Sequence, residues 1–306
     1  MLAWTVDHSS PSHLSLREVP DPVPGPHDAV IQVLAFAPNH GDLEALPGLP
    51  DGMIPGWDAA GVVVAEALDG TGPRLGQVVA SLGVDSAWAQ RRLVTAESVG
   101  VAPDGADPNL TSVVPVAATS ALRGLRRLGP LLGRRVLVLG GTSAVGLFAV
   151  QLAARSGAEV VATTRNRAAR RRLVELGARE VIAAPSDLGQ DVSGVLDLLG
   201  GSHLVEAFAR LAPGGTLVAL GHAAGQGERF GYGALFGDAG RHDRSLTTFF
   251  LGAETGLGPD MAWLATEIHE GRLDPVVVAV RPWQELPDAF AAGAGRTHGK
   301  VVLTVG

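Results

Sequence analysis

Apolar residues along this chain follow two different rhythms, and the change falls near residue 110. Beyond it, short apolar runs of strand length alternate with longer runs at helical spacing. Alternation of this kind is typical of a parallel sheet with helices wound on both faces. The pattern predicts strands at 135–139, 159–164, 180–182, 195–199 and 215–220, and helices at 115–128, 145–156, 167–176 and 202–211.

Before residue 110 the apolar runs are short and are interrupted by Pro and Gly. The predicted strands cover 29–34, 60–65, 77–80 and 90–94. Short strands at this spacing favour a partly open β-barrel over a parallel sheet.

The last part of the chain returns to the pattern of the first. We expect its C-terminus to fold back onto the N-terminal domain, so that a nucleotide-binding domain at 119–253 is inserted between segments 1–118 and 254–306. The active site is then expected in the cleft between the two domains. The predicted elements are a strand at 245–251 on the far edge of the parallel sheet, a helix at 259–270, a strand at 276–280, a helix at 285–292 and a strand at 300–305.

A Gly-rich turn follows the predicted strand 135–139 and runs straight into the apolar helix at 145–156. Small residues allow the backbone to approach a pyrophosphate, and the free N–H groups at the start of the helix attract the anion. The turn departs from the usual G-x-G-x-x-G because Ser143 stands where the middle glycine is expected. A structural turn in another doubly wound sheet is the alternative interpretation.

The residues after the second strand of this domain separate the two nicotinamide cofactors. A carboxylate there would accept the ribose hydroxyls of NAD, whereas this chain has Arg165, Asn166 and Arg167 after the strand 159–164. The sequence therefore favours NADPH, with Arg165 and Arg170 as phosphate ligands. The other arginines of 165–172 are expected on the solvated face of a helix.

Composition narrows the classes of function further. A net charge of −7 and a pI near 5.7 give no basic surface for nucleic acid or for an anionic membrane. The chain has no cysteine, which excludes disulfides, thiolate catalysis and cysteine-bound zinc. No apolar run approaches the roughly 20 residues that span a bilayer, and the start lacks the features of a signal peptide. We expect a cytoplasmic protein.

Seven blocks along nearly the whole chain resemble the medium-chain dehydrogenase/reductase superfamily, in particular its zinc-independent quinone oxidoreductase and enoyl reductase branch. The resemblance implies a Rossmann-type sheet inserted in a GroES-like, partly open β-barrel domain. The blocks are the Gly-rich turn and the segments 20–26, 37–43, 55–63, 115–122, 213–215 and 299–303.

Zinc-containing alcohol dehydrogenases are similar too, but they need a cysteine in the block 37–42. They also carry Gly-His-Glu where this chain has Gly56, Trp57 and Asp58. No metal is therefore expected, and oxidation of an alcohol through a metal alkoxide is improbable.

The resemblance also implies where the site residues lie. Asn39 lies near the nicotinamide and its amide can donate to an oxyanion, while Asp42 orients Asn39 or caps a backbone N–H. The alternative for Asn39 is a turn residue. The resemblance implies that the Thr119 hydroxyl contacts the nicotinamide ribose or ring, and the alternative for Thr119 is a helix N-cap. His40 is unusual at its place and is a candidate proton donor, because imidazole titrates near neutrality. The cofactor contacts are expected from Thr119, Gly140, Thr142, Ser143, Ala144, Val145, Gly146, Thr164, Arg165, Arg170, Gly221, Phe249, Phe250 and Lys300.

The chemistry left to a site without metal or cysteine is hydride transfer from NADPH to an activated C=C bond or a quinone. Two tyrosines usual in this branch are absent, one from the loop 44–52 and one from the position of Ala183 and Ala184. A non-catalytic NADPH-binding protein is therefore an alternative, as is a cyclase or other biosynthetic enzyme of the same fold. The edge strand 245–251 predicts a homodimer, because corresponding strands pair across a two-fold axis in this family.

Overall fold

The computed structural model describes residues 1–238, 240–291 and 298–306. The chain forms two compact units. The outer unit consists of Met1–Thr119 and Gly252–Gly306, and the inserted unit consists of Ser120–Leu251. In the described ranges, no helix is both long and apolar enough to cross a bilayer.

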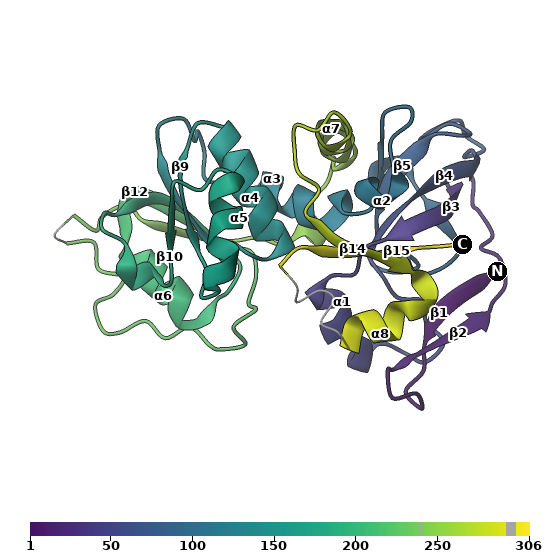
Figure 1. Ribbon diagram of the computed structural model, residues 1–306, viewed down its shortest axis with the longest axis horizontal. Helices are drawn as coiled ribbons and strands as arrows, with labels where there is room; N and C mark the ends of the chain where they lie inside the picture. The colour runs from purple at the N-terminus through teal and green to yellow at the C-terminus, as the bar shows by residue number, and fades with distance from the viewer. Residues whose placement is uncertain (239, 292–297) are drawn as a thin grey trace. The chain divides into compact units, whose positions relative to one another are not determined.

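A six-stranded sheet forms the centre of the inserted unit (Figure 1), and every strand pair in it is parallel. Its order is β10-β9-β8-β11-β12-β13, so the order reverses between β8 and β11, where such sheets bind ligands. The predicted doubly wound sheet is confirmed. The strands are β8 (Arg135–Leu139), β9 (Glu159–Thr163), β10 (Glu180–Ile182), β11 (Val192–Asp197), β12 (Leu211–Ala219) and β13 (Ser245–Thr248).

Helices pack on this sheet because its strands are apolar on both sides. Leu137, Val161, Leu196 and Leu217 are fully buried, as expected of strands that helices cover from two faces. Figure 1 shows α4 and α5 on one face and α6 on the other. The helices of the inserted unit are α3 (Thr119–Arg126), α4 (Ala144–Arg155), α5 (Arg170–Glu175) and α6 (Gly201–Ala209).

The outer unit contains a seven-stranded sheet of order β14-β15-β3-β4-β5-β7, with β6 also paired to β3, and a separate hairpin of β1 and β2. Among the described residues β14 and β7 do not pair with each other, so the sheet is not a closed barrel. The strands are β1 (Leu2–Val6), β2 (Leu14–Glu18), β3 (Ala29–Phe36), β4 (Asp58–Ala65), β5 (Val78–Leu82), β6 (Arg91–Val94), β7 (Val99–Val101), β14 (Val277–Pro282) and β15 (Lys300–Thr304).

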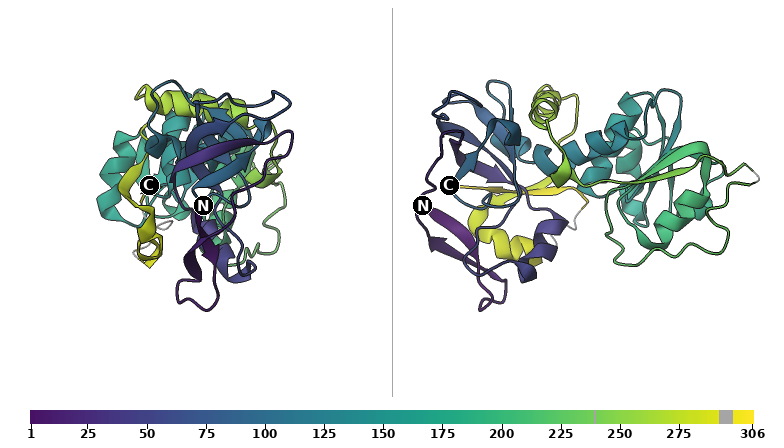
Figure 2. Two further views of the ribbon diagram at one scale, coloured as in Figure 1. Left: turned by 90° about the vertical axis from the view of Figure 1, so that its right-hand side faces the viewer. Right: turned by 180° about the vertical axis from the view of Figure 1, so that it is seen from behind.

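The C-terminal strand β15 lies beside β3, as Figure 2 shows by the yellow strand among the purple ones. Leu303 is opposite Phe36 and Thr304 is opposite Ala35 in an antiparallel pair. The C-terminal strand therefore shares a sheet with strands of the N-terminal segment, and this return places Lys300, the first residue of β15, beside the residues that follow β3.

Four helices complete the outer unit. Helix α7 lies directly on β7, because a Cβ at Gly100 would come within 2.5 Å of the backbone nitrogen of Ala262. The core beneath α8 holds the fully buried Trp88, which stacks on Phe36. The helices are α1 (His40–Ala45), α2 (Pro108–Thr111), α7 (Gly258–His269) and α8 (Leu286–Ala291).

Two predicted strands run at least two residues past the observed ends. The strand predicted at 245–251 ends at Thr248, because Phe249 turns into the core and is only 8% exposed. The strand predicted at 195–199 ends at Asp197, whose carboxylate accepts hydrogen bonds from the amides of Leu199 and Gly200 and turns the chain out of the sheet.

The helix predicted at 115–128 is divided. A π-helical turn covers Val114–Ala118, and α3 begins at Thr119. The end of the helix predicted at 285–292 falls on residue 292, which lies outside the described residues.

Candidate cofactor and active site

The Gly-rich turn of the inserted unit connects β8 to α4 through a backbone that only glycine allows. Gly140 has a positive φ of 76°. A Cβ at Gly146 would lie 2.4 Å from the carbonyl oxygen of Gly140, so the first turn of α4 can approach the strand only without a side chain there. These glycines provide the tight turn and the close helix–strand packing that a dinucleotide-binding turn requires.

Ser143, which replaces the middle glycine, is the N-cap of α4. Its hydroxyl accepts a hydrogen bond from the amide of Gly146 at 3.1 Å and donates to the carbonyl of Gly140 at 2.9 Å. The following residues Ala144 and Val145 belong to the first turn of the helix, where amides have no partner within the helix and attract an anion. The substitution therefore retains the features that bind a pyrophosphate.

The end of β9 lies beside this turn. Thr163 accepts a hydrogen bond from the amide of Gly140 through its hydroxyl, and its carbonyl accepts one from Gly141. Thr164 is buried, and its hydroxyl accepts from the amide of Asn166. Arg165 and Arg170 are exposed. The structure thus puts cationic side chains, and no carboxylate, directly after the second strand.

Three further predicted cofactor residues lie after β12 and β13. Gly221 donates to the carbonyl of Asp197, and a Cβ there would lie 2.8 Å from the carbonyl oxygen of Leu198. Phe249 is buried, with the Arg127 guanidinium 4.9 Å from its ring centre, whereas Phe250 is 72% exposed. The role of these residues in cofactor binding stays a prediction.

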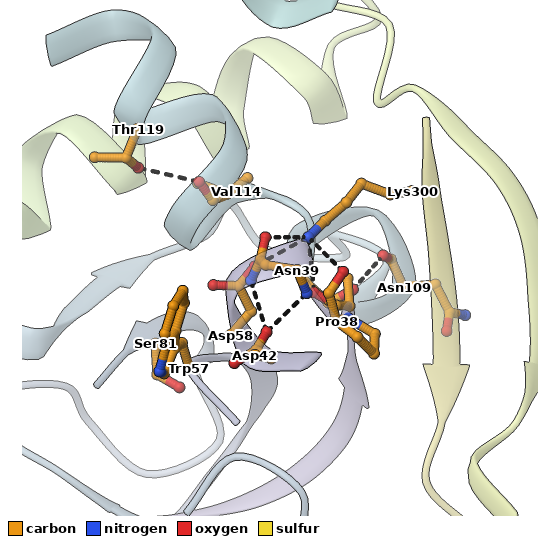
Figure 3. A network of polar contacts seen from close by, with 12 residues as sticks. Pro38, Asn39, Asp42, Trp57, Asp58, Ser81, Asn109, Val114, Thr119 and Lys300 are labelled. Atoms are coloured by element: carbon orange, nitrogen blue, oxygen red, sulfur yellow. Dashed lines mark hydrogen bonds and ion pairs between the residues drawn. The ribbon is translucent and has the colours of Figure 1, made fainter. Parts of the chain in front are cut away.

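In the outer unit, a buried network of polar groups surrounds Asn39, the residue before α1 (Figure 3). Its side-chain amide donates to Asp42 Oδ2 and to Asp58 Oδ2, each at 3.1 Å. The Asn39 backbone amide also donates to Asp42 Oδ2, at 2.7 Å. Both amide protons are thus directed at carboxylates. A hydrogen bond from Asn39 to a substrate oxyanion stays a prediction, and it requires one of these two bonds to be exchanged.

The Lys300 ammonium closes this network on the other side. Its Nζ donates to Asn39 Oδ1 at 2.7 Å, to the carbonyl oxygens of Ala37 and Pro38 at 2.7 and 3.2 Å, and to Asp58 Oδ2 at 3.3 Å. The side chain is only 2% exposed. The contact between Lys300 and the cofactor that the resemblance implies is not tested by these bonds, and it would require the ammonium to give up some of them.

Two buried carboxyl groups in one network perturb each other. Burial raises the pKa of Asp42 to about 7, and the charge of Asp58 adds to the rise. Burial raises the pKa of Asp58 as well, while the Lys300 ammonium opposes that rise. One oxygen of each, Oδ1, is buried and has no hydrogen-bond partner in the part of the chain that the structure describes. A proton held by Asp42 therefore has a place on Oδ1, because Oδ2 already accepts hydrogen bonds from Asn39.

His40 is the first residue of α1, and 31% of its side chain is exposed. Its Nε2 lies 3.1 Å from Glu44 Oε1, one helical turn further on. Its Nδ1 is buried and has no hydrogen-bond partner among the residues that the structure describes. The pairing with Glu44 holds the ring in one orientation, and a role for His40 as proton donor stays a prediction.

Thr119 is fully buried, and its hydroxyl donates to the carbonyl of Val114 at 3.0 Å, across the π-helical turn. The alternative of a helix N-cap does not describe this bond, because the hydroxyl contacts a carbonyl rather than an amide. A contact from this hydroxyl to the nicotinamide stays a prediction.

The residues around Asn39 do not fit a catalytic zinc ion. Zinc requires thiolate, imidazole or carboxylate ligands with an open position. Here the chain has no cysteine, Trp57 stands where the alcohol dehydrogenases have a histidine, and the Lys300 ammonium already lies among the available oxygens.

A sheet of this strand order with such a turn is typical of dinucleotide-binding folds, and known proteins of similar structure share the fold. Residues 176–303 match a family described as zinc-binding dehydrogenase. A quinone oxidoreductase from Coxiella burnetii has a similar structure, with a TM-score of 0.85, 21% identity, and 100% and 99% of the two chains covered. The structure of 2-haloacrylate reductase also gives a TM-score of 0.85, at 23% identity and 99% coverage of both chains.

Among curated proteins, a phenolphthiocerol/phthiocerol polyketide synthase of Mycobacterium tuberculosis is 28% identical over 95% of this chain. The match covers 14% of that much longer protein. Over nearly its whole length the chain is thus similar to oxidoreductases of the medium-chain dehydrogenase/reductase superfamily.

Within each unit the structure brings predicted residues together. Residues 140–146, Thr164 and Arg165 lie around one sheet edge, and Asn39, His40 and Asp42 lie at the start of α1. Sequence reasoning missed the roles of Asp58 and Lys300 in the network. The available signal was an acidic residue at the head of the apolar run 59–65.

Proposed function

We propose that this protein is an NADPH-dependent, zinc-independent reductase that adds hydride to an activated C=C bond. The observation that carries the proposal is the combination of a dinucleotide-binding turn, a cationic position after β9 and a metal-free polar network at Asn39. Bound NADPH would supply the hydride. All other steps fall to the chain's own residues.

Arg165 supports NADPH over NADH. It follows β9 directly and is exposed, so its guanidinium is free of the core and can reach a phosphate on the adenosine ribose. A planar guanidinium binds phosphate with paired hydrogen bonds. A carboxylate at this point would instead accept the ribose hydroxyls of NADH and repel the phosphate.

Addition of hydride to an enone or enoyl acceptor places negative charge on the carbonyl oxygen, which then needs a hydrogen-bond donor. Asn39 becomes such a donor when one of its carboxylate partners releases it. Asp42 is that partner, because its pKa lies near 7 and a protonated carboxyl is a poorer acceptor. Asp58 and Lys300 keep the rest of the amide in place.

His40 is proposed to give the proton that completes the reduction. Its Nδ1 is the unpartnered nitrogen, and Glu44 stabilises the ring when it is charged. If His40→Gln retains full turnover between about pH 6 and about pH 8, His40 is not the donor. The exposed His269→Gln on α7 is the matched control.

The proposed substrate is an enone or enoyl compound rather than an alcohol. The 2-haloacrylate reductase and the quinone oxidoreductase, by their names, act on electron-poor acceptors. The polyketide synthase relative points to an enoyl thioester as the first acceptor to try. A quinone is the other acceptor in this class.

Absorbance of NADPH in the near ultraviolet tests the proposal directly. The protein is mixed with NADPH and, in turn, a crotonyl thioester, a simple enone and a quinone. The proposal predicts saturable oxidation of NADPH with an acceptor that carries an activated C=C bond. Tight binding of NADPH with no turnover on any acceptor would instead identify a non-catalytic nucleotide-binding protein.

A further inference from the structure

The chain contains 24 basic residues of the lysine and arginine type, and Lys300 is the only lysine among them. Lysine is ordinarily a surface residue and is almost never fully buried unless it is paired. Here the single lysine is the one that is only 2% exposed. All the other lysine or arginine positions of the chain are arginines, and position 300 alone has an ammonium side chain.

The ammonium lies inside a cage of protein oxygens. Four oxygens lie within 3.3 Å of Nζ, namely the carbonyls of Ala37 and Pro38, Asn39 Oδ1 and Asp58 Oδ2. An ammonium has three protons, so all of them are used inside the outer unit. These bonds connect the first residue of β15 to the segment that runs from β3 into α1.

A guanidinium can also be buried in this unit, which makes the choice of lysine informative. Arg92 is 3% exposed, and its two terminal nitrogens donate to oxygens of Trp57, Ser81 and Asp85. Its planar fork reaches acceptors that are spread over several strands and loops. The oxygens around Lys300 instead converge on one atom, which suits a compact point charge and not a fork.

The amide of Asn39 has its orientation set by this cage. Nδ2 donates to Asp42 and Asp58, whereas Oδ1 accepts from Lys300. Among the described residues Lys300 is the only donor to Asn39 Oδ1, so it determines which end of the amide faces the carboxylates. Without the ammonium, Asn39 Oδ1 would lose its donor and the orientation of the amide would no longer be fixed. Asp58 would remain buried but would lose its contact with a cation.

We propose that Lys300 is a positioning residue for the reduction: its ammonium is an internal cation that fixes the Asn39 amide and the start of α1, and it does not contact the cofactor. The inference rests on the proposed function only for its effect on turnover. The internal cage itself is testable without any reaction.

The first test uses the single lysine as a spectroscopic probe. Protein grown with [ζ-15N]lysine gives one side-chain ammonium signal. We expect that signal to be protected from solvent exchange at neutral pH, because all three protons are bonded. Arg171→Lys provides the matched reference, since Arg171 lies on α5 with 89% of its side chain exposed, and its new ammonium should exchange too fast to be seen.

Two further measurements distinguish a contact with Asp58 from a contact with the cofactor. Asp58→Asn removes the negative charge and leaves one acceptor oxygen in place of two, so it should shift or broaden the Lys300 signal. Saturating NADPH should move it less than Asp58→Asn does. An unprotected Lys300 signal, or one that NADPH moves more than Asp58→Asn does, would overturn the proposal in favour of a cofactor contact.

The second test is kinetic and uses Lys300→Arg, which keeps the charge. Because a fork cannot occupy the cage as the ammonium does, we expect kcat to fall at least tenfold while KM for NADPH stays within twofold. A KM for NADPH raised tenfold with kcat unchanged, or a variant with wild-type kcat, would contradict a positioning role. If the wild-type protein has no turnover, the proposed function fails. The ammonium signal still shows whether Lys300 is bonded inside the cage.

Discussion

At the scale of single residues, Arg165 separates the two nicotinamide cofactors. A hydrogen bond to a charged group contributes about 1.5–3 kcal/mol. Arg165→Glu should therefore raise KM for NADPH by about tenfold to a hundredfold, while KM for NADH stays level or falls. Steady-state kinetics with both cofactors measure the ratio.

Arg171→Gln is the matched control for this change. Arg171 belongs to the same run of arginines but is ion-paired with Glu175 one helical turn away. It should leave both KM values within twofold. An unchanged ratio of the two KM values in Arg165→Glu would show that Arg165 does not bind the phosphate that distinguishes NADPH from NADH.

Asp42 predicts a pH dependence of stability. Its folded pKa of about 7 lies above that of an unfolded carboxyl, so the folded state binds the extra proton and gains stability as pH falls. Lowering the pH from 8 to 6 should add about 1.4 kcal/mol in the wild-type protein relative to Asp42→Asn. Urea unfolding at both pH values measures it. A D42N variant with the same pH slope as the wild type would refute this assignment.

From the sequence, the role of a single residue could be proposed only where the residues next to it form a recognisable motif. Arg165 and His40 stand out beside a strand end and a family block. The pair of Asp58 and Lys300 did not, because 242 positions separate the two residues and no local pattern spans that distance. Only the return of β15 to β3 makes them neighbours.

At the scale of elements, the Gly-rich turn gives a sharp prediction. A Cβ at Gly146 would lie 2.4 Å from the Gly140 carbonyl oxygen, so Gly146→Ala must push α4 away from β8. Overpacking of this kind costs about 1–3 kcal/mol. The variant should unfold at lower denaturant and bind NADPH at least tenfold more weakly by calorimetry.

The control for this variant is Gly189→Ala. Nothing lies within 4 Å of a Cβ at Gly189, so this substitution should change neither stability nor NADPH affinity beyond error. Wild-type NADPH affinity in Gly146→Ala would mean that the pyrophosphate does not bind at this turn.

Elements were predicted well where local periodicity decides them and less well where a distant contact ends them. Strands β8 and β10 have their expected limits. Strand β11 stops where the Asp197 carboxylate captures two amides, and β13 stops where Phe249 turns into the core. The apolar pattern continues past both points and gives no sign of either.

At the scale of the whole molecule, we predict a homodimer formed through β13. All four of its residues are exposed, and it is an edge strand whose outer hydrogen-bonding groups a second copy would satisfy. Light scattering after size exclusion should give twice the mass of 31.4 kDa. Leu246→Lys, which places like charges near the two-fold axis, should give a monomer.

Val278→Lys is the control for this substitution. Val278 is similarly exposed, on the edge strand β14 of the outer unit, and the variant should remain a dimer. A wild-type monomer at micromolar concentration would contradict the prediction.

The insertion could be predicted from the sequence, because short strands return after residue 276 and must pair with an existing sheet. In the structure the last strand, β15, pairs with β14 and with β3 of the N-terminal segment, so the unit Ser120–Leu251 is inserted into the outer unit.

Transfer of deuterium tests the central claim most directly. The protein, freed of metal by chelation, is incubated with a crotonyl thioester and with NADPH that carries deuterium at both hydrogen positions of C4 of the nicotinamide. The account predicts a saturated thioester with one deuterium at its β-carbon, formed at the same rate with and without added zinc. A product that forms only after zinc is restored, or no deuterated product from any activated C=C acceptor, would contradict it.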